Sequence, residues 1–252
     1  MKLVNKFLSA IGLKLYSTKD ANVSFADIDN PEFWEFYAIV KEYTMVSIPN
    51  LYSLYNSALY VVKNGIEGDF VECGVWRGGC SMMVALVFKK YGVTDRKIYM
   101  YDTFEGMPPP SEQDFDFKNS KAKDLLKIKP TKERNSIWCI ADIEDVSANI
   151  KLTKYALDNF VLIKGKVEDT LNENLPKNKL AILRLDTDWY ESTKEELERL
   201  YPILITNGVL IIDDYGHWQG ARRAVDEYLQ ENGIHLLLNR VDYTCRLAIV
   251  NH

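Results

Sequence analysis

Two runs of apolar residues, each of strand length, end in a pair of carboxylates. The run 181–186 leads into Asp186 and Asp188, and the run 209–213 leads into Asp213 and Asp214. Carboxylates are too costly to bury at strand ends unless water, cations or protons receive them. If the two strands are neighbours in a parallel sheet, their carboxyl ends open into the crevice where open α/β sheets bind ligands. The pattern therefore predicts a metal site and metal-assisted chemistry in that crevice.

Short apolar strands alternate with longer helical segments from residue 68 onwards, which is typical of a mostly parallel sheet covered by helices on both faces. Two further apolar segments near the end of the chain, 234–239 and 245–250, are close enough to form an antiparallel edge pair. The sequence therefore predicts an α/β fold in which the parallel strands are residues 69–73, 97–102, 160–164, 181–186 and 209–213.

The first 67 residues have a different pattern, and we expect a helical amino-terminal segment there, followed by one domain over 68–252. Asn30 and Pro31 are typical of a helix start, with Asn30 as the cap. A second helix is expected over about 50–64. The first 12 residues contain a short apolar run, which favours an amphipathic helix that packs on the domain over one that touches a membrane or a partner.

A long polar stretch at about 105–135 separates the second and third predicted strands. It begins at Glu105, contains Pro108, Pro109 and Pro110, and continues through a lysine-rich region. Loops of this length inside a domain are usually lids, binding loops or insertions. We expect a lid-like insertion, and an ordinary surface insertion is the alternative.

Charge and cysteine content exclude several classes of function. The formal net charge of −5 over 252 residues argues against a nucleic-acid partner, which would need a clustered basic face. The cysteines, four in number, do not have the spacing of a zinc site, and reduced cysteines in the cytoplasm fit best. No stretch reaches membrane-spanning length, and the amino-terminal apolar run is too short for a signal peptide, so we expect a cytoplasmic protein without a membrane span.

The segment 70–81 is a strand followed by a glycine-rich turn and a helix start. Glycines there let a ligand approach the backbone, although such turns often only reverse the chain. Glu72 at the strand end would repel a pyrophosphate but could pair with the ammonium of an amino-acid moiety. This charge points away from NAD and towards S-adenosylmethionine. Asp102 ends the next strand, where a carboxylate can hold both ribose hydroxyls of a nucleoside or, alternatively, cap a helix.

With these residues in place, the chain resembles the macrocin O-methyltransferase (TylF-like) family, whose members methylate sugar hydroxyls on antibiotics and related glycosides. The resemblance extends from Tyr43 to about Tyr228, and its most specific segments are 68–79, 101–107, 185–193 and 211–216. It implies a class I methyltransferase, Rossmann-like fold, S-adenosylmethionine as cofactor, Mg²⁺, and a saccharide acceptor such as a glycoside or polysaccharide precursor.

The resemblance also assigns roles to individual positions. Asp186, Asp213 and Asp214 would bind magnesium, and Asp188 would be the general base. The positions expected to bind the cofactor are Met45, Ser47, Glu72, Gly74, Val75, Trp76, Gly78, Ser81, Asp102 and Thr103.

A sugar hydroxyl is a poor nucleophile near neutral pH, so such an enzyme must acidify and align it, and a cation held by carboxylates does both. His217 is a rival base, because its ordinary pKa suits proton transfer near neutrality. Alternatively, His217 or Trp218 lines the acceptor pocket.

Helix capping is the competing explanation of the acidic pairs. The competing functions are a phenol or catechol methyltransferase and a non-catalytic cofactor-binding assembly subunit. The sequence leaves the oligomeric state undecided, and the apolar amino-terminal helices could form the interface of a homo-oligomer.

Overall fold

The computed structural model describes residues 25–127, 136 and 138–251, so the helix expected in the first 12 residues lies outside the described part. The chain forms two compact units, residues 1–35 and residues 36–252. In the first unit, Asn30 Oδ1 accepts a hydrogen bond from Phe33 N at 3.1 Å. This bond confirms Asn30 as the cap of α3 (Pro31–Val40). The domain boundary expected at residue 67 stays a prediction.

The second unit is built on a seven-stranded sheet with the order β3-β2-β1-β4-β5-β7-β6. Strands β1 to β5 are parallel, and β7 pairs antiparallel with β5 and with β6, which confirms the predicted mostly parallel sheet with an antiparallel edge. The strands are β1 (Asp69–Cys73), β2 (Ile98–Asp102), β3 (Phe160–Lys164), β4 (Leu180–Leu185), β5 (Leu204–Ile212), β6 (Asn239–Arg240) and β7 (Arg246–Ile249).

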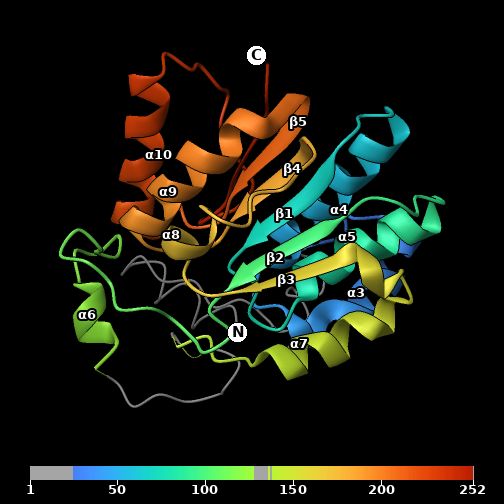
Figure 1. Cartoon of the computed structure of the whole chain (residues 1–252), viewed down its shortest axis with the longest axis horizontal. Helices are drawn as coiled ribbons and strands as arrows, with labels where there is room; N and C mark the ends of the chain where they lie inside the picture. The colour runs from blue at the N-terminus through green and yellow to red at the C-terminus, as the bar shows by residue number, and fades with distance from the viewer. Residues whose placement is uncertain (1–24, 128–135, 137, 252) are drawn as a thin grey trace, which may run out of the picture. The chain divides into compact units, whose positions relative to one another are not determined.

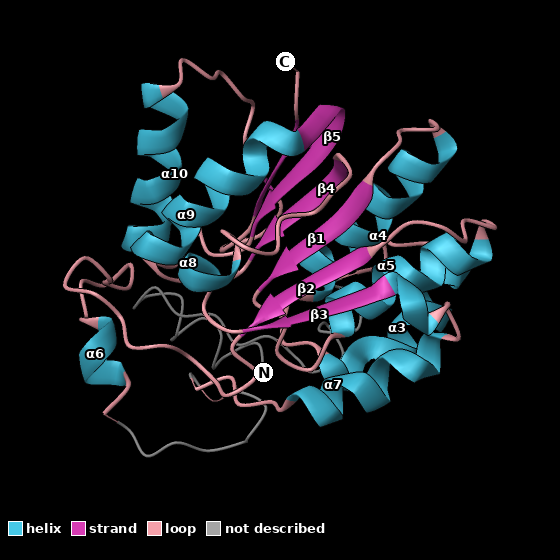
Figure 2. Cartoon of the chain, viewed as in Figure 1, coloured by secondary structure: helices cyan, strands magenta, loops and turns pink. Residues whose placement is uncertain are grey.

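Helices cover both faces of this sheet, as Figure 1 and Figure 2 show. One layer contains α4 (Ile48–Lys63), α5 (Gly79–Lys90) and α7 (Ile143–Ile150), and the other contains α8 (Val167–Thr170), α9 (Tyr190–Leu200) and α10 (Gln219–Glu231). The remaining short helices are α6 (Ala122–Leu125) and the 3-10 turns Lys41–Tyr43, Lys151–Thr153, Leu157–Asn159 and Tyr201–Ile203.

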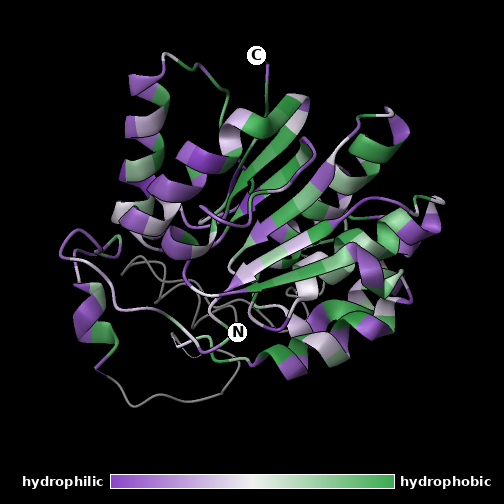
Figure 3. Cartoon of the chain, in the orientation of Figure 1, coloured by the Kyte–Doolittle hydropathy of each residue, from purple (hydrophilic) through white to green (hydrophobic). Residues whose placement is uncertain are grey.

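Burial explains why the central strands β1 and β4 are mostly apolar. Every residue of β1 and β4 is buried, since helices pack on both faces of these strands. Figure 3 shows the corresponding hydrophobic colour on the central strands and the hydrophilic colour on much of the outer helices. The charged residues of these two strands, Asp69, Glu72 and Arg184, are buried as well.

The predicted strand bounds differ from the observed ones by more than one residue at two places. Strand β5 begins at Leu204, five residues before the predicted start, because the ladder continues past an irregularity around Asn207, which has a φ of 65°. The segment 234–239 is not the predicted strand, since β6 contains only Asn239 and Arg240. Ile234, Leu236 and Leu238 alternate in the sequence because they pack on the core cluster without joining the sheet.

Helix α4 begins at Ile48, two residues before the predicted start. Ser47 is its N-cap, and its Oγ accepts a hydrogen bond from Asn50 N at 3.2 Å. Pro49 follows in the first turn, where a missing N–H costs nothing. The cap places residues 43–47 directly before α4, where Thr44 Oγ1 lies 3.5 Å from Cys80 Sγ in α5.

The described part of the lid-like insertion is attached to the starts of α9 and α10. Asp114 is 1% exposed, and its carboxylate accepts hydrogen bonds from Tyr190 N at 2.9 Å and from Ser111 N at 2.6 Å. Gln219 Nε2 donates to the carbonyl of Asp116 at 2.7 Å. Helix α6 then packs on a small apolar cluster that contains Trp189, Trp218 and Ala221. Residues 128–135 of the insertion lie outside the described part of the chain.

Within the residues described, no helix is long and apolar enough to cross a membrane. Cys73, Cys80, Cys139 and Cys245 are free thiols, as expected from their scattered positions.

Candidate active site

A cavity of about 550 Å³ opens at the carboxyl ends of the central strands. Strand β4 ends next to Asp186, and β5 ends next to Asp213, so the two acidic pairs come from neighbouring parallel strands as predicted. Asp186, Asp188, Asp213 and Asp214 all line this cavity. Its size is within the range of about 300–1,000 Å³ that is usual for small-molecule sites.

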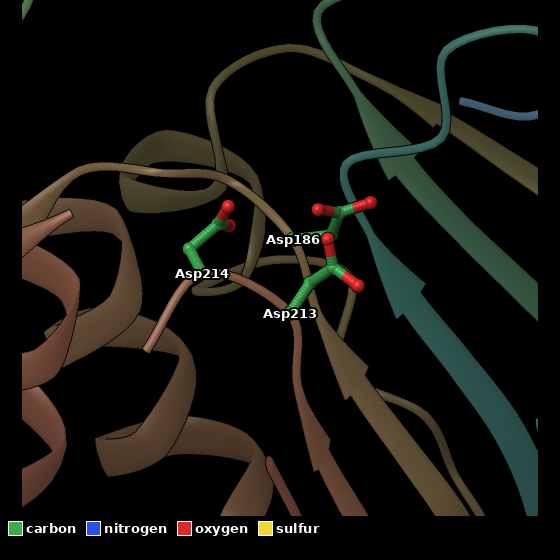
Figure 4. Close-up of side chains that lie close together, drawn as sticks. All are labelled: Asp186, Asp213 and Asp214. Carbon is green, nitrogen blue, oxygen red and sulfur yellow. The ribbon is translucent and has the colours of Figure 1, made fainter. Parts of the chain in front are cut away.

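The carboxylates of Asp186, Asp213 and Asp214 converge at this edge of the sheet, as Figure 4 shows. Each residue offers an oxygen that lies within 4.8 Å of the oxygens of the other two. Asp213 and Asp214 are buried, and Asp186 is partly buried. Three hard oxygen ligands at this spacing are suited to a divalent cation such as Mg²⁺.

Arg184 lies beneath these carboxylates and was not singled out from the sequence. Its Nη1 donates to Glu72 Oε1 at 3.0 Å and to Asp186 Oδ2 at 2.6 Å, and its Nη2 donates to Asp213 Oδ1 at 2.9 Å. The side chain has no exposed surface. A buried guanidinium is stable only when anions surround it, so a lone arginine inside an apolar strand was a sequence signal for nearby carboxylates.

Burial raises the pKa of Asp186 and of Asp214 well above the usual aspartate range, and each is raised further by its acidic neighbours. Arg184 acts in the opposite direction on both. A divalent cation at this position would likewise favour the ionised carboxylates.

Asp188 lies beside the cluster in a left-handed backbone conformation (φ 69°). Its amide donates to Asp214 Oδ2 at 3.2 Å, and its Oδ1 accepts a hydrogen bond from Trp218 Nε1 at 2.5 Å. Burial and the charge of Asp186 raise the pKa of Asp188 to about 7. The carboxylate is therefore held in a fixed orientation at the cavity wall and is suited to accept a proton near neutral pH.

Helix capping does not explain the acidic pairs. Helices α9 and α10 begin after Trp189 and Trp218, and neither start has a hydrogen bond from the side chain of its N-cap residue. The first amide of α9, on Tyr190, is instead satisfied by Asp114 of the insertion. The four acids thus point into the cavity and are available to a ligand.

His217, the rival base, does not line the cavity. Its Nδ1 lies 2.6 Å from the hydroxyl of Tyr243, and its ring packs against Phe117 and Trp218. Partial burial lowers the pKa of His217. This arrangement favours Asp188 as the proton acceptor and places His217 in an aromatic group beside the cavity.

The glycine turn after β1 approaches β4 very closely. Gly74 has a φ of 82°, and a Cβ atom there would lie 1.9 Å from the carbonyl oxygen of Asp186. No other residue type fits at this position. The turn continues through Val75 and Trp76, which line the cavity together with Gly74.

Asp102 binds this turn. Its Oδ2 accepts hydrogen bonds from Val75 N at 2.7 Å and Trp76 N at 3.1 Å, and its Oδ1 accepts one from Phe104 N at 2.7 Å. Burial raises the pKa of Asp102, while these amides act against that shift. Asp102 therefore orients the turn and does not cap α5, whose N-cap is Gly78. Asp102 also lines the cavity, where it can be reached by a ligand. Its contact with ribose hydroxyls stays a prediction.

Glu72 is also occupied by protein groups. Its Oε1 pairs with Arg184, and its Oε2 accepts hydrogen bonds from the amide and hydroxyl of Ser81. Burial raises the pKa of Glu72, and the charge of Arg184 lowers it. Glu72 lines the cavity, and pairing with a ligand ammonium stays a prediction. Ser81 is outside the cavity wall and contacts the cavity only through its hydrogen bonds to Glu72.

Most residues singled out from the sequence lie together around this cavity. Met45, Ser47 and Thr103 join those already described, whereas Gly78, Ser81 and His217 are outside its wall. Sequence reasoning missed Asn50, whose Nδ2 donates to Asp213 Oδ1, because an asparagine inside a helix carries no visible signal. It also missed Asp242 and Tyr243, which reach the cavity from the turn between β6 and β7.

Comparison with known proteins identifies the family of this chain. The family model described as macrocin-O-methyltransferase (TylF) matches residues 38–248. A 4'-O-methyltransferase of Streptomyces olivaceus that acts on a dimethoxyrhamnosyl tetracenomycin is 36% identical over 202 residues, which is 80% of this chain and 73% of the relative. The demethyldecarbamoylnovobiocin O-methyltransferase of Streptomyces niveus is 32% identical over 74% of this chain and 67% of the relative.

Solved structures show the same fold. The O-methyltransferase NovP matches with a TM-score of 0.72 and 30% identity over 83% of each chain. The calicheamicin methyltransferase CalS11 matches with a TM-score of 0.59 and 21% identity, over 88% of this chain and 93% of its own.

Proposed function

Because the chain belongs to the TylF family of macrocin O-methyltransferases, we propose that it transfers a methyl group from S-adenosylmethionine to a sugar hydroxyl, with Mg²⁺ in the acidic cluster. The acceptor is a glycoside or a polysaccharide precursor. The observation that carries the proposal is the convergence of Asp186, Asp213 and Asp214 beside Asp188 at the wall of the cavity.

The methyl donor would lie along the glycine turn. The close backbone approach at Gly74 keeps the turn against β4, and Asp102 holds the amides of Val75 and Trp76 in place. Of the cofactor positions expected from the sequence, those in the cavity wall support this proposal most directly: Met45, Ser47, Glu72, Gly74, Val75, Trp76, Asp102 and Thr103. The same fold contains S-adenosylmethionine in the TomG structure, which is 12% identical with a TM-score of 0.54.

The acidic cluster fits a magnesium ion. Arg184 binds only one oxygen each of Asp186 and Asp213, and the amide of Asp188 binds one oxygen of Asp214. Each carboxylate thus keeps a second oxygen that can serve as a ligand. When bound, such a cation lowers the pKa of an acceptor hydroxyl and orients it.

Asp188 then accepts the hydroxyl proton as the sugar oxygen forms its bond to the methyl carbon and the carbon–sulfur bond of the donor breaks. Trp218 holds Asp188 Oδ1, and the amide of Asp188 is fixed by Asp214. The pair of contacts aligns the base before the acceptor binds.

Methyl transfer to a sugar is tested directly with purified protein, S-adenosylmethionine and Mg²⁺. We expect mass spectrometry to show one added methyl group on the sugar of a rhamnoside, and no transfer to catechol. Transfer to catechol alone would support the phenol-type enzyme. Binding of the cofactor without transfer over a broad panel of glycosides would support a non-catalytic subunit.

Replacement of Asn50 by alanine is expected to weaken metal binding, because Asn50 Nδ2 orients the proposed ligand Asp213. Loss of such an outer contact typically lowers metal affinity by about 10- to 100-fold. The Mg²⁺ concentration that gives half-maximal turnover should rise accordingly, measured after chelator treatment and readdition of metal. Asn56→Ala, on the exposed side of the same helix, should leave this concentration unchanged. An equal effect of both substitutions would contradict the role of Asn50.

Replacement of Trp218 by phenylalanine keeps the aromatic packing but removes the hydrogen bond to Asp188. Hydrogen bonds to charged groups are worth about 1.5–3 kcal/mol, so we expect kcat to fall by about 10- to 100-fold with little change in KM for the methyl donor. Trp189→Phe is the matched control, since Trp189 Nε1 donates to the carbonyl of Pro108 and not to the base. If both variants lose the same activity, Trp218 acts only through packing.

The remaining expectations stay proposals. We propose that the partners are small molecules and not nucleic acid, that the insertion acts as a lid, and that the amino-terminal helices support a homo-oligomer in the cytoplasm. Size-exclusion chromatography with light scattering would test the oligomer.

A further inference from the structure

The turn that carries Asp186 and Asp188 has an unusual backbone. Asp188 has a φ of 69°, and across it Trp189 N donates to the carbonyl of Thr187 at 2.8 Å. A three-residue turn with a positive φ at its centre is rare, and it is strained for a residue other than glycine. Such a conformation persists only where the surroundings hold it. The groups that hold this turn therefore decide where the proposed metal ligand and the proposed base lie.

Two of the contacts that hold the turn belong to the site itself. Asp188 N donates to Asp214 Oδ2 at 3.2 Å, and Trp218 Nε1 donates to Asp188 Oδ1. Asp214 is a proposed metal ligand and Asp188 is the proposed base, so both contacts involve groups whose charge is altered by metal binding or proton transfer. A group that holds the turn independently of these events must lie outside the metal cluster.

Thr187 connects the turn to such a group. Its Oγ1 donates a hydrogen bond to Glu196 Oε1 at 2.9 Å. Glu196 lies in α9 and is 0% exposed, and its helix neighbours Leu197 and Leu200 are buried in the core cluster. Because the helix is anchored in the core, the carboxyl of Glu196 is a fixed acceptor for the Thr187 hydroxyl.

Glu196 is an expensive residue for packing alone. Its second oxygen, Oε2, is buried and has no hydrogen-bond partner among the described residues. Burial raises the pKa of Glu196 well above the usual glutamate range, although the hydrogen bond from Thr187 lowers it. The charges of Glu168 and Asp214 raise it further, and the shift favours the neutral acid. Since a polar group buried in this way costs free energy, an apolar side chain of similar size should pack there at least as well.

We propose that Glu196 is a positioning residue that acts through Thr187 to hold the turn of Asp186 and Asp188 in its catalytic conformation. Glu196 is outside the wall of the cavity, whereas Thr187 is part of that wall, so the effect of Glu196 passes through the Thr187 hydroxyl. This inference rests on the proposed function, because it concerns the proposed metal ligand and the proposed base.

Hydrogen exchange of the amides of Asp188 and Trp189, followed by NMR spectroscopy without substrate, measures how firmly the turn is held. Glu196→Leu and Thr187→Val each remove the hydrogen bond and nearly keep the side-chain shape. We expect both amides to exchange about two- to tenfold faster in each variant, the usual worth of one hydrogen bond. The Tm of Glu196→Leu should equal or exceed that of the wild type, because the substitution removes a buried polar group.

Steady-state kinetics of the same variants test the link to the reaction. We expect kcat to fall by a similar factor of about two to ten, while KM for S-adenosylmethionine stays within about twofold. The Mg²⁺ concentration that gives half-maximal turnover should rise, since Asp186 is on the same turn. The double variant Glu196→Leu/Thr187→Val should lose no more than either single variant, because both substitutions remove the same bond.

Three further variants make the result specific. Glu196→Gln and Thr187→Ser each keep the hydrogen bond, so they should retain most of the protection of the turn and most of kcat. Glu198→Leu changes an exposed glutamate of the same helix and should leave both quantities unchanged.

The inference is overturned if Glu196→Leu and Thr187→Val keep wild-type exchange and wild-type kcat, or if their losses add in the double variant. It is also overturned if Glu196→Gln loses as much as Glu196→Leu, or if protection falls along the whole of α9 and not at the turn. Failure of the proposed function gives a different result: faster exchange at the turn in both variants, with no methyl transfer by the wild type, would remove the activity and leave Glu196 as the residue that holds the turn.

Discussion

Asp188→Asn lowers kcat by about 10²- to 10⁴-fold, the usual contribution of a positioned general base, while KM for S-adenosylmethionine stays within about twofold. Asparagine has the same shape and can still accept the hydrogen bond from Trp218 Nε1, but it cannot take the hydroxyl proton. The loss should therefore appear in the chemical step. Single-turnover kinetics with a saturating glycoside acceptor measure it.

His217→Gln is the matched control for this prediction. His217 is outside the cavity wall and contacts Tyr243, so its replacement should change kcat far less than the change at Asp188. A larger loss at His217 than at Asp188 would reverse the assignment of the base. An equal affinity of both variants for S-adenosylhomocysteine would show that the cofactor site is intact.

Arg184→Met destabilises the folded protein by about 3–5 kcal/mol, as expected when one partner of a buried ion pair is removed. Arg184 is the cation that Glu72, Asp186 and Asp213 share, and it has no contact with solvent. Without it, three carboxylates remain close together in a buried place, and they must take up protons or separate. Urea denaturation followed by circular dichroism measures the loss.

Two substitutions make the result for Arg184 interpretable. Arg199→Met removes the exposed partner of Glu195 on α9 and should cost less than about 1 kcal/mol. Arg184→Lys keeps a positive charge but not the fork that reaches three carboxylates, so its stability should lie between those of the wild type and the methionine variant. A methionine variant as stable as the wild type would mean that the carboxylates are protonated and need no cation.

Much of the fold follows from local patterns in the chain. The five parallel strands were predicted because each is a short, mostly apolar run that alternates with longer helical segments, and burial on both faces requires such runs. The segment 234–239 misled the prediction because side chains that pack on a core alternate whether or not the backbone pairs with a neighbour. The strand order depends on long-range pairing. The sequence predicted only that the strands ending at Asp186 and Asp213 are neighbours.

Part of the candidate site, too, could be predicted from the sequence, and part could not. Asp186, Asp213 and Asp214 could be chosen in advance because acids at strand ends in an α/β fold are exposed to one crevice. The contacts of Arg184, Asn50 and Trp218 could not, since their partners are 29 or more residues away in the sequence, apart from Asp186 beside Arg184. A resemblance to a family can name the ligands, but it does not say which buried groups hold them.

Residue types and their spacing along single strands and turns were thus enough to predict the family, the class of fold and the acids that line the cavity. The folded chain alone decided which oxygens Arg184 occupies, that Trp218 orients Asp188, and that Phe117, His217 and Tyr243 gather beside the cavity. These contacts join residues that are far apart in the sequence, such as Arg184 with Asp213 and Phe117 with Tyr243, and they form only when the sheet has formed.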